Sequence, residues 1–505
     1  MLFHSPAFIF AFLPICFLGF VLIHRFWGWE RALSWLAAAS IFFYGQWSLA
    51  LAALLTGSIL TNYAVVRVLL AKLDQRRLAS SILMGAIAAN LSLLAYFKYA
   101  NFFIDNIDAL LGPVLSHIKV ILPIGISFYT FIQIGFLIET YNGQVKEVSF
   151  THYFLFGSFF PCVTAGPIIL QKEMMRQFAA PRAGGVDVSA VAVGLTVFGI
   201  GLFKKLVLAD NIAPFADAVF DGAAAGAVAT TTTAWIGALA YTLQLYFDFS
   251  GYSDMALGIG QMFGLKLPLN FNSPLKACSI TDFWRRWHMT MTRFFTNYLY
   301  SPIAMRMMRR ALQRSYGPRT RFLAVIALPV TATFVLAGLW HGAGWTFIVF
   351  GLIHGLALAT NHAWREARMP ALSPLAGWLL TMGVVVLGLV FFRAASVPVA
   401  LSLLASMIGL GADTAAAISS EVAVVGVDAF LALAWIVVLG TIALTCPNSQ
   451  EIMRHHWFSS DPEPESGPKW LVWQPTVAWG LVGAIALAAA LGSMSGDTAF
   501  LYYQF

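Results

Sequence analysis

One histidine of the sequence lies inside a long apolar stretch and has a glycine on either side. Gly338 and Gly342 bracket Trp340 and His341, and hydrophobic runs continue in both directions. Glycine permits a bend and the close approach of another group. An ionisable side chain buried in such a setting is a functional candidate, and imidazole is well suited to moving a proton near neutral pH. We therefore interpret His341 as a catalytic base, although a lone histidine can also serve packing alone.

Acyl transfer to a hydroxyl group is the reaction that suits such a histidine. A neutral imidazole would accept the hydroxyl proton while the oxygen attacks a thioester carbonyl, and the proton would return to the departing thiol. General base assistance of this kind contributes about 10²–10⁴-fold in rate. A hydrogen-bond donor must also stabilise the oxyanion, and the sequence does not identify that donor.

A second histidine follows a predicted helix start. Ser279 and Asp282 have the spacing of a capping box, so we expect a helix to begin there. Trp284, His288 and Thr292 would then share one face of this helix at i, i+4 spacing. Dense Trp and Arg are also typical of a helix at a membrane interface. We expect His288 to assist catalysis by orienting the substrate or the donor.

Two acidic residues lie in a third apolar stretch, among glycine and serine. Asp248 and Asp254 are six residues apart, with Ser250 and Gly251 between them. This pattern predicts a broken helix that lines a polar cavity, or alternatively a structural polar cluster that joins two helices. We take the following residues as candidates for the wall of a substrate tunnel: Asp248, Ser250, Asp254, Trp284, Trp340 and Trp345.

The remaining histidines and cysteines give weaker signals. His354 lies thirteen residues beyond His341, too far along a straight helix to reach the same point, and we expect it to be a packing residue with a satisfied hydrogen bond. The four cysteines are scattered without metal-ligand spacing, at Cys16, Cys162, Cys278 and Cys446. We therefore predict no metal site.

The elements that must hold these residues are membrane-spanning helices. The chain has 505 residues, of which 59% are hydrophobic and 10% charged, whereas soluble chains carry about 25% charged residues. Apolar runs approach the roughly 20 residues that cross a bilayer as helix, and they do not alternate as the strands of a membrane β-barrel would. We expect an all-α polytopic protein with about 11 to 14 spans, the clearest runs being Ile9–Ile23, Leu33–Leu51, Leu78–Tyr96, Val191–Phe203, Phe322–Trp340, Trp345–Thr360, Trp378–Phe392, Val422–Leu444 and Trp470–Leu491.

The net charge of +7 is better explained by membrane topology than by binding of nucleic acid. Lys and Arg are enriched in cytoplasmic loops, which places Arg25–Arg31 and Lys72–Arg77 in the cytoplasm. A hairpin between these loops would turn near Gln46 and Trp47, and the N-terminus would lie outside. The acid-free basic tract Arg306–Arg321 reflects topology too, or else contacts a donor or partner.

Four motifs resemble the membrane-bound O-acyltransferase (MBOAT) family, and specifically its bacterial branch for alginate O-acetylation. Two of them contain the histidines, at 282–288 and 338–347, and two more lie at 246–256 and 123–129. The similarity extends to about Arg393. It divides a single membrane domain, 1–505, into N-terminal hairpins (1–111), an MBOAT catalytic core (121–393) and C-terminal helices (394–505).

The resemblance implies a mechanism and a setting. His341 matches the family's essential histidine, and His288 matches its second, more variable polar position. The family's fold is a ring of tilted transmembrane and re-entrant helices around a central tunnel. Acetyl-CoA or another acyl thioester would serve as a cytoplasmic donor substrate, with no bound cofactor. Periplasmic O-acetyltransferase partners would complete the transfer to a polysaccharide, and the chain would lie in the bacterial inner membrane.

The leading hypothesis is therefore a membrane O-acetyltransferase for an exported polysaccharide, alginate or alginate-like. A proton-coupled transporter or permease, with Asp248, Asp254 and His341 as a proton relay, is an alternative from another functional class. A third possibility is an enzyme of the same family that acts for peptidoglycan or teichoic acid. The motifs do not separate the acceptors.

Overall fold

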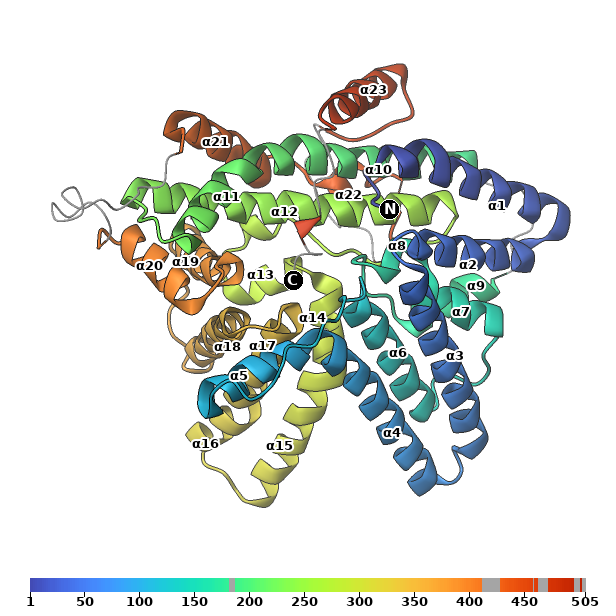
Figure 1. Cartoon of the computed structure of the whole chain (residues 1–505), viewed down its shortest axis with the longest axis horizontal. Helices are drawn as coiled ribbons and strands as arrows, with labels where there is room; N and C mark the ends of the chain where they lie inside the picture. The colour runs from blue at the N-terminus through green and yellow to red at the C-terminus, as the bar shows by residue number, and fades with distance from the viewer. Residues whose placement is uncertain (181–186, 411–426, 457, 462–470, 495–499, 502–505) are drawn as a thin grey trace. The chain divides into compact units, whose positions relative to one another are not determined.

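The described residues of this computed structural model form helices joined by loops, and Figure 1 shows the order of the helices. The description covers residues 1–180, 187–410, 427–456, 458–461, 471–494 and 500–501. Within these ranges, β structure is limited to isolated bridge residues, among them the pair Leu267 and Ser459. The all-α prediction is confirmed, while the starts of two predicted runs, Val422–Leu444 and Trp470–Leu491, lie outside the described residues.

The chain divides into two compact units, each made of segments distant in sequence. Unit 1 contains Met1–Leu202, Tyr252–Leu269 and Glu451–Leu487, and unit 2 contains Phe203–Gly251, Asn270–Gln450 and the described part of 488–505. The long helix α12, Thr231–Met262, contributes residues to both. The predicted division into hairpins, core and C-terminal helices follows the chain order instead, and it stays a prediction.

Unit 1 is built mostly from the N-terminal helices. Their bounds are η1 Phe8–Phe12, α1 Leu13–Trp27, α2 Trp29–Gly45, α3 Leu49–Lys72, α4 Arg76–Leu94, η2 Ala95–Tyr99, α5 Ala100–Leu111, α6 Ile126–Tyr141, α7 Phe150–Ser158, α8 Phe160–Val163, α9 Gln171–Ala179 and α10 Val188–Phe203. Helices α3, α4 and α6 lie side by side (Figure 1). The predicted turn near Gln46 and Trp47 is confirmed, because α2 ends and α3 begins around it.

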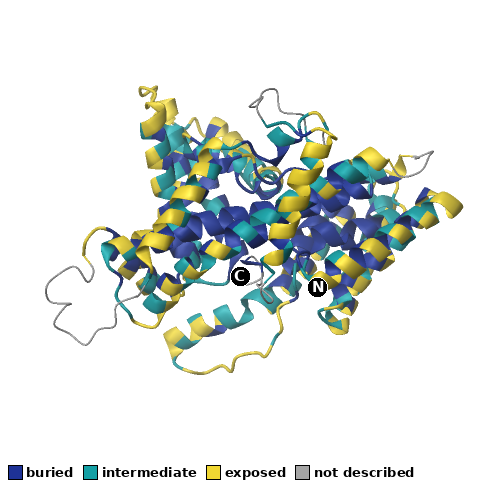
Figure 2. Cartoon of the chain, turned by 90° about the horizontal axis from the view of Figure 1, so that it is seen from above, coloured by how far each residue is buried: buried dark blue, intermediate teal, exposed yellow. Residues whose placement is uncertain are grey.

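Most helices of the molecule have a buried side and an exposed side, as Figure 2 shows by colour. In α3 the buried positions recur every three or four residues, for example at Leu55, Ile59, Asn62 and Val66. The exposed side of the same helix is also apolar and includes Leu49 and Val68. A helix that is apolar on all sides is typical of a membrane span, because its outer side meets lipid.

A polar pair inside unit 1 joins α3 to α4. The amide of Asn62 donates to Asn90 Oδ1 at 3.1 Å, and the amide of Asn90 donates back to Asn62 Oδ1 at 2.8 Å. Both side chains are buried. Interhelical amide bonds of this kind contribute about 0.6–2 kcal/mol in membranes, so this pair fixes the register between the two helices.

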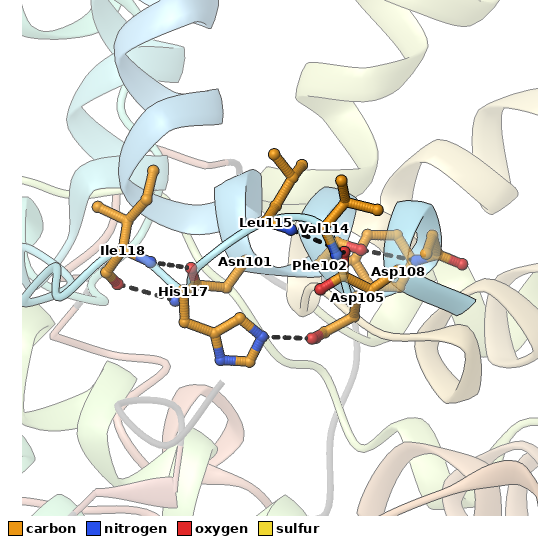
Figure 3. A network of polar contacts seen from close by, with 9 residues as sticks. Asn101, Phe102, Asp105, Asp108, Val114, Leu115, His117 and Ile118 are labelled. Atoms are coloured by element: carbon orange, nitrogen blue, oxygen red, sulfur yellow. Dashed lines mark hydrogen bonds and ion pairs between the residues drawn. The ribbon is translucent and has the colours of Figure 1, made fainter. Parts of the chain in front are cut away.

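The connection after α5 is held by a polar network that Figure 3 shows. Asp108 Oδ1 accepts hydrogen bonds from the backbone N–H groups of Val114 and Leu115. Asn101 exchanges two hydrogen bonds with the backbone of Ile118, and the ring of His117 contacts Asp105 at 2.6 Å. The segment 112–118 is therefore folded back onto α5 by side chains of that helix.

Unit 2 contains the helices that carry the two candidate histidines. Its elements are η3 Lys204–Ala209, α11 Asp210–Ala224, η4 Pro274–Lys276, α13 Ile280–Arg286, α14 Met289–Phe295, η5 Thr296–Tyr300, α15 Ser301–Gln313, α16 Pro318–Phe322, η6 Leu323–Ala327, α17 Leu328–His341, α18 Trp345–Glu366, α19 Pro374–Arg393, α20 Val397–Met407 and α21 Ala429–Thr445. Two further helices have residues in both units, α22 Ser449–Ile452 and α23 Val477–Gly492. Helix α17 packs along α18, and α18 packs along α19.

Among the described residues, seven helices are long and apolar enough to cross a membrane, and three shorter apolar helices accompany them. The seven are Phe8–Trp27, Leu49–Lys72, Arg76–Leu111, Val188–Ala224, Pro318–His341, Trp345–Glu366 and Pro374–Arg393. This is fewer than the 11 to 14 spans expected, and α6 illustrates why. It has 16 residues, or about 24 Å of helix, against about 30 Å of hydrocarbon.

Candidate active site

His341 is the last residue of α17, at a tight turn into α18. Gly342 and Gly344 continue in extended conformation, and α18 begins at Trp345. A Cβ atom on Gly342 would lie 2.1 Å from the Phe347 ring, and one on Gly338 would lie 2.1 Å from the Phe347 carbonyl oxygen. The glycines around His341 therefore allow α18 to return closely against α17, which confirms the close approach expected from the sequence.

His288 lies in a break between two short helices. Ser279 caps α13 as predicted, since its Oγ accepts a hydrogen bond from the Asp282 N–H at 3.1 Å. The helix ends at Arg286, Trp287 is extended, and His288 has a left-handed backbone with φ of 42°. The prediction that Trp284, His288 and Thr292 share the face of one continuous helix is therefore wrong.

Asn270 explains this break. Its backbone oxygen accepts from the Met289 N–H at 2.9 Å, in place of an intrahelical bond. Its side-chain Oδ1 accepts from Thr290 Oγ1 at 2.9 Å and from the Thr290 N–H at 3.3 Å, and it lies 3.0 Å from His288 Nδ1. A backbone N–H can only donate, which identifies this amide atom as the oxygen. His288 Nδ1 must then carry the proton, and Nε2 is left as the basic nitrogen of the ring.

The two histidines lie close together inside unit 2. Their ring centroids are 6.4 Å apart, and both rings contact Trp340, at 6.1 Å from His288 and 4.9 Å from His341. His288 is fully buried and His341 is 5% exposed. Burial lowers the pKa of His288 to about 3, because desolvation disfavours the charged ring. His288 is therefore neutral at physiological pH.

Aromatic side chains surround this pair. The ring of Phe249 lies 4.8 Å from that of His288, and the rings of Phe350 and Phe392 lie 6.0 Å and 5.2 Å from that of His341. All three phenylalanines are buried. An apolar enclosure of this kind excludes water and strengthens electrostatic interactions within it.

Trp284 and His354 form a separate contact beside the site. The indole Nε1 of Trp284 donates to His354 Nδ1 at 3.2 Å, and the two rings are 5.1 Å apart. His354 is 1% exposed, and a Cβ on Gly388 would lie 2.6 Å from its Nε2. This arrangement agrees with the packing role expected for His354.

The acidic residues of the third motif lie on α12, which runs without interruption from Thr231 to Met262. The predicted helix break there is therefore wrong. Asp248 is neutralised within unit 2, where Lys205 Nζ lies 2.7 Å from its Oδ1 and 2.8 Å from Asp210 Oδ1. Pairing of this kind lets a carboxylate remain on a buried helix without breaking it.

The other tunnel candidates have different surroundings. Ser250 is buried on the unit 2 part of α12, whereas Asp254, also buried, belongs to unit 1. Trp340 is 3% exposed and touches both histidines, but Trp345 is 57% exposed. The structure thus brings His341, His288 and Trp340 together, and their catalytic and tunnel roles stay predictions.

Three partners of the site were missed by the sequence reasoning. Lys205 could have been found, because a lysine that follows an apolar run is an unusual intramembrane charge. Asn270 gave no signal in the sequence, since its contacts depend on a chain reversal. The third is Leu501, whose N–H donates to Asp248 Oδ2 at 3.0 Å. The ring of the preceding residue, Phe500, lies 5.8 Å from that of Phe249.

Comparison with known proteins adds an independent line of evidence. The family model described as the membrane-bound O-acyltransferase family matches residues 29–404. A peptidoglycan O-acetyltransferase of Helicobacter pylori is 40% identical over 452 residues, which cover 83% of this chain and 82% of the relative. A probable alginate O-acetylase of Pseudomonas aeruginosa is 39% identical over 81% of this chain and 75% of its own length. A teichoic acid D-alanyltransferase of Streptococcus thermophilus is 27% identical over 48% of this chain and 58% of its own length.

Proposed function

Since the chain belongs to the membrane-bound O-acyltransferase family, we propose that it passes acetyl groups from a cytoplasmic thioester donor across the bacterial inner membrane. The acetyl groups would serve the O-acetylation of an exported cell-surface polysaccharide, alginate or alginate-like. The chain is a multi-pass membrane acyltransferase, and this family membership argues against the alternative of a proton-coupled transporter. The donor, the direction and the acceptor are parts of the proposal.

The observation that carries the proposal is the buried pair of histidines 6.4 Å apart against one tryptophan. In the proposed step, His341 accepts the proton of an acceptor hydroxyl while the hydroxyl oxygen attacks the thioester carbonyl. The C–O bond forms, the C–S bond breaks, and the imidazolium returns its proton to the departing thiolate. The products are an acetyl ester and a free thiol.

His288 is proposed to assist this step without changing its own charge. Asn270 fixes its Nδ1 as a hydrogen-bond donor, which makes Nε2 the nitrogen of the ring that can act as an acceptor. A neutral, immobilised acceptor can orient a reacting hydroxyl group at little entropic cost. In this role His288 positions the acceptor and His341 moves the proton.

Two acceptors are supported by relatives. The probable alginate O-acetylase favours an alginate-like exopolysaccharide, and periplasmic O-acetyltransferase partners would complete that transfer. The peptidoglycan O-acetyltransferase, at 40% identity, favours peptidoglycan as the second candidate. Acetyl-CoA is the proposed donor substrate for both.

A deletion strain tests the function and separates the two acceptors. Exported polysaccharide and purified peptidoglycan would each be treated with mild alkali, and the released acetate would be measured with and without the gene restored on a plasmid. The proposal expects acetate to disappear from the polysaccharide fraction alone. Loss from peptidoglycan alone would replace the first acceptor by the second, and unchanged acetate in both fractions would contradict the proposal.

A further inference from the structure

Unit 1 contains a polar hollow that is separate in sequence from the histidine motifs. It has a volume of about 570 Å³, within the range of about 300–1,000 Å³ that is typical of ligand sites. Its wall combines α9, the segment that follows α12 and the segment near residue 460. The lining residues are Lys172, Glu173, Arg176, Gln177, Lys266, Ser459 and Ser460.

Positive charge dominates this hollow. Lys172, Arg176 and Lys266 all line it, and none of these side chains forms an ion pair within the described part of the chain. The one acid in the lining, Glu173, accepts a hydrogen bond from the Leu170 N–H at 3.4 Å and so faces the start of its own helix. Asp461 does not line the hollow, and its Oδ2 accepts a hydrogen bond from the Leu269 N–H at 2.6 Å. Three cations are therefore available to a ligand.

The walls of the hollow are fixed to one another by hydrogen bonds. The Gln177 amide donates to the Lys266 carbonyl oxygen at 2.8 Å and accepts from the Lys266 N–H at 2.8 Å. Ser459 Oγ and the Ser460 N–H both donate to the Leu267 carbonyl oxygen, at 2.9 Å and 3.1 Å. Three distant segments are thus held in one arrangement, and a ligand would meet a site that is already formed.

Contacts within unit 1 place the hollow at the predicted cytoplasmic end. The indole of Trp29 donates to the Phe178 carbonyl oxygen at 2.7 Å, which joins the end of α9 to the start of α2. The next residue, Glu30, lies within the basic segment Arg25–Arg31 that the distribution of Lys and Arg assigns to the cytoplasm. With this predicted orientation, helix α9 lies on the cytoplasmic side, where the proposed thioester donor would be supplied.

We propose that this hollow binds a phosphate-bearing anion from the cytoplasm. Arginine and lysine bind phosphate through charge-assisted hydrogen bonds, and the hydroxyl group of Ser460, which also lines the hollow, supplies a further donor. The phosphates of coenzyme A are one source of this chemistry, which rests on the proposed function, and a phospholipid headgroup is the other. In both cases Lys172, Arg176 and Lys266 make the principal contacts.

Binding measured without turnover tests the proposal. In the first experiment, the full-length protein would be placed in nanodiscs of phosphatidylcholine and titrated with coenzyme A. In the second, it would be placed in nanodiscs that also contain phosphatidylglycerol, and the enrichment of this lipid around the protein would be measured. The triple variant K172Q/R176Q/K266Q removes the three cations. Arg77→Gln removes one exposed positive charge of the same unit that does not line the hollow. We expect the triple variant to weaken binding about 10-fold or more, and Arg77→Gln to change it less than about 2-fold.

The outcomes separate this inference from the proposed function. If the triple variant no longer binds coenzyme A, the phosphate that the hollow binds comes from the nucleotide. If the triple variant loses only the enrichment of phosphatidylglycerol, the phosphate comes from the lipid headgroup. Equal binding of both probes by the triple variant and the wild type would overturn the inference, as would an equal effect of Arg77→Gln. A His341→Ala protein that binds coenzyme A normally but no longer supports acetylation would show that the two proposals stand on different residues.

Discussion

Asn270 holds His288 through a single oxygen atom that accepts from the imidazole and twice from Thr290. Replacing Asn270 by alanine would leave the buried Nδ1–H of His288 without its acceptor, at a cost of about 1–3 kcal/mol. The ring would also lose the contact that fixes its tautomer. We expect Asn270→Ala to lower the acetylation rate by about 5- to 150-fold, the same free energy expressed as a rate, measured as acetyl esters per unit of membrane-inserted protein.

Two readouts distinguish this positioning role from simple destabilisation. The double variant Asn270→Ala/His288→Ala should be no slower than His288→Ala alone, because the asparagine acts through the histidine. Asn270→Asp keeps an acceptor, and its carboxylate would raise the pKa of His288 from about 3. The acid limb of the pH profile should therefore move upward in that variant. Independent, additive losses with an unchanged pH profile would contradict the role.

Residue type and setting were enough to identify His288 and His341 as candidates, because ionisable side chains are rare in apolar membrane sequence and usually functional. Their proximity could not be predicted, since 53 positions of chain separate them. Asn270 was missed for the same reason. Its role comes from a backbone reversal between residues 270 and 289, and no local pattern records it.

The close packing of α17 against α18 depends on glycine at the contact. A Cβ on Gly338 would lie 2.1 Å from the Phe347 carbonyl oxygen, and backbone atoms cannot move aside as a flexible side chain can. We expect Gly338→Ala to destabilise the protein by about 1–3 kcal/mol through overpacking, and to shift His341, which lies less than one turn away. The midpoint of thermal unfolding in detergent measures the first effect, and acetyl ester content measures the second.

Gly383→Ala is the matched control. Gly383 lies inside α19, and a Cβ there would have no neighbour within 4 Å. Alanine is favoured over glycine in a helix by about 1 kcal/mol, so this variant should unfold at the same temperature as the wild type or higher. A lower midpoint in both variants would show that the contact with Phe347 is not the cause.

Helix starts were easier to predict than helix breaks. The Ser279 cap was correctly predicted, because a capping interaction is local in sequence. The break at His288 and the continuity of α12 were both predicted wrongly. In each case a distant residue decides the outcome, since Asn270 bonds the chain after α13 and Lys205 neutralises Asp248 on α12.

At the scale of the whole molecule, topology is the property that the distribution of charge predicts most directly. The two ends of α3 should lie on opposite sides of the membrane, with Gln46 outside and Asp74 in the cytoplasm. Both residues are exposed in the short connections before and after this helix. We expect an impermeant maleimide to label Gln46→Cys in intact cells, and to label Asp74→Cys only in inverted vesicles.

The background for this labelling is small. Cys16 and Cys162 are buried, so replacing Cys278 and Cys446 by serine should suppress the native signal. Labelling of Asp74→Cys in intact cells, with Gln46→Cys protected, would reverse the predicted orientation. It would also place the basic hollow beside α9 on the outer side, where the proposed donor is absent.

Composition was sufficient to predict a helical multi-pass membrane protein, because so few charges cannot cover a soluble molecule of this length. The number of spans was less predictable. Helix α6 is apolar but only 16 residues long, and α12 carries Asp248 and Asp254 in a 32-residue helix. Hydropathy does not separate such buried core helices from helices that face lipid.

The catalytic role of His341 is tested most directly by its replacement with alanine, with alkali-released acetate measured on the exported polysaccharide. His341 is placed in the step itself, so the variant should fall to the acetate level of the deletion strain, while its amount in the membrane and its thermal unfolding remain close to wild type. A His341→Ala protein that is present at normal levels and yields wild-type acetate would show that His341 is not the catalytic base.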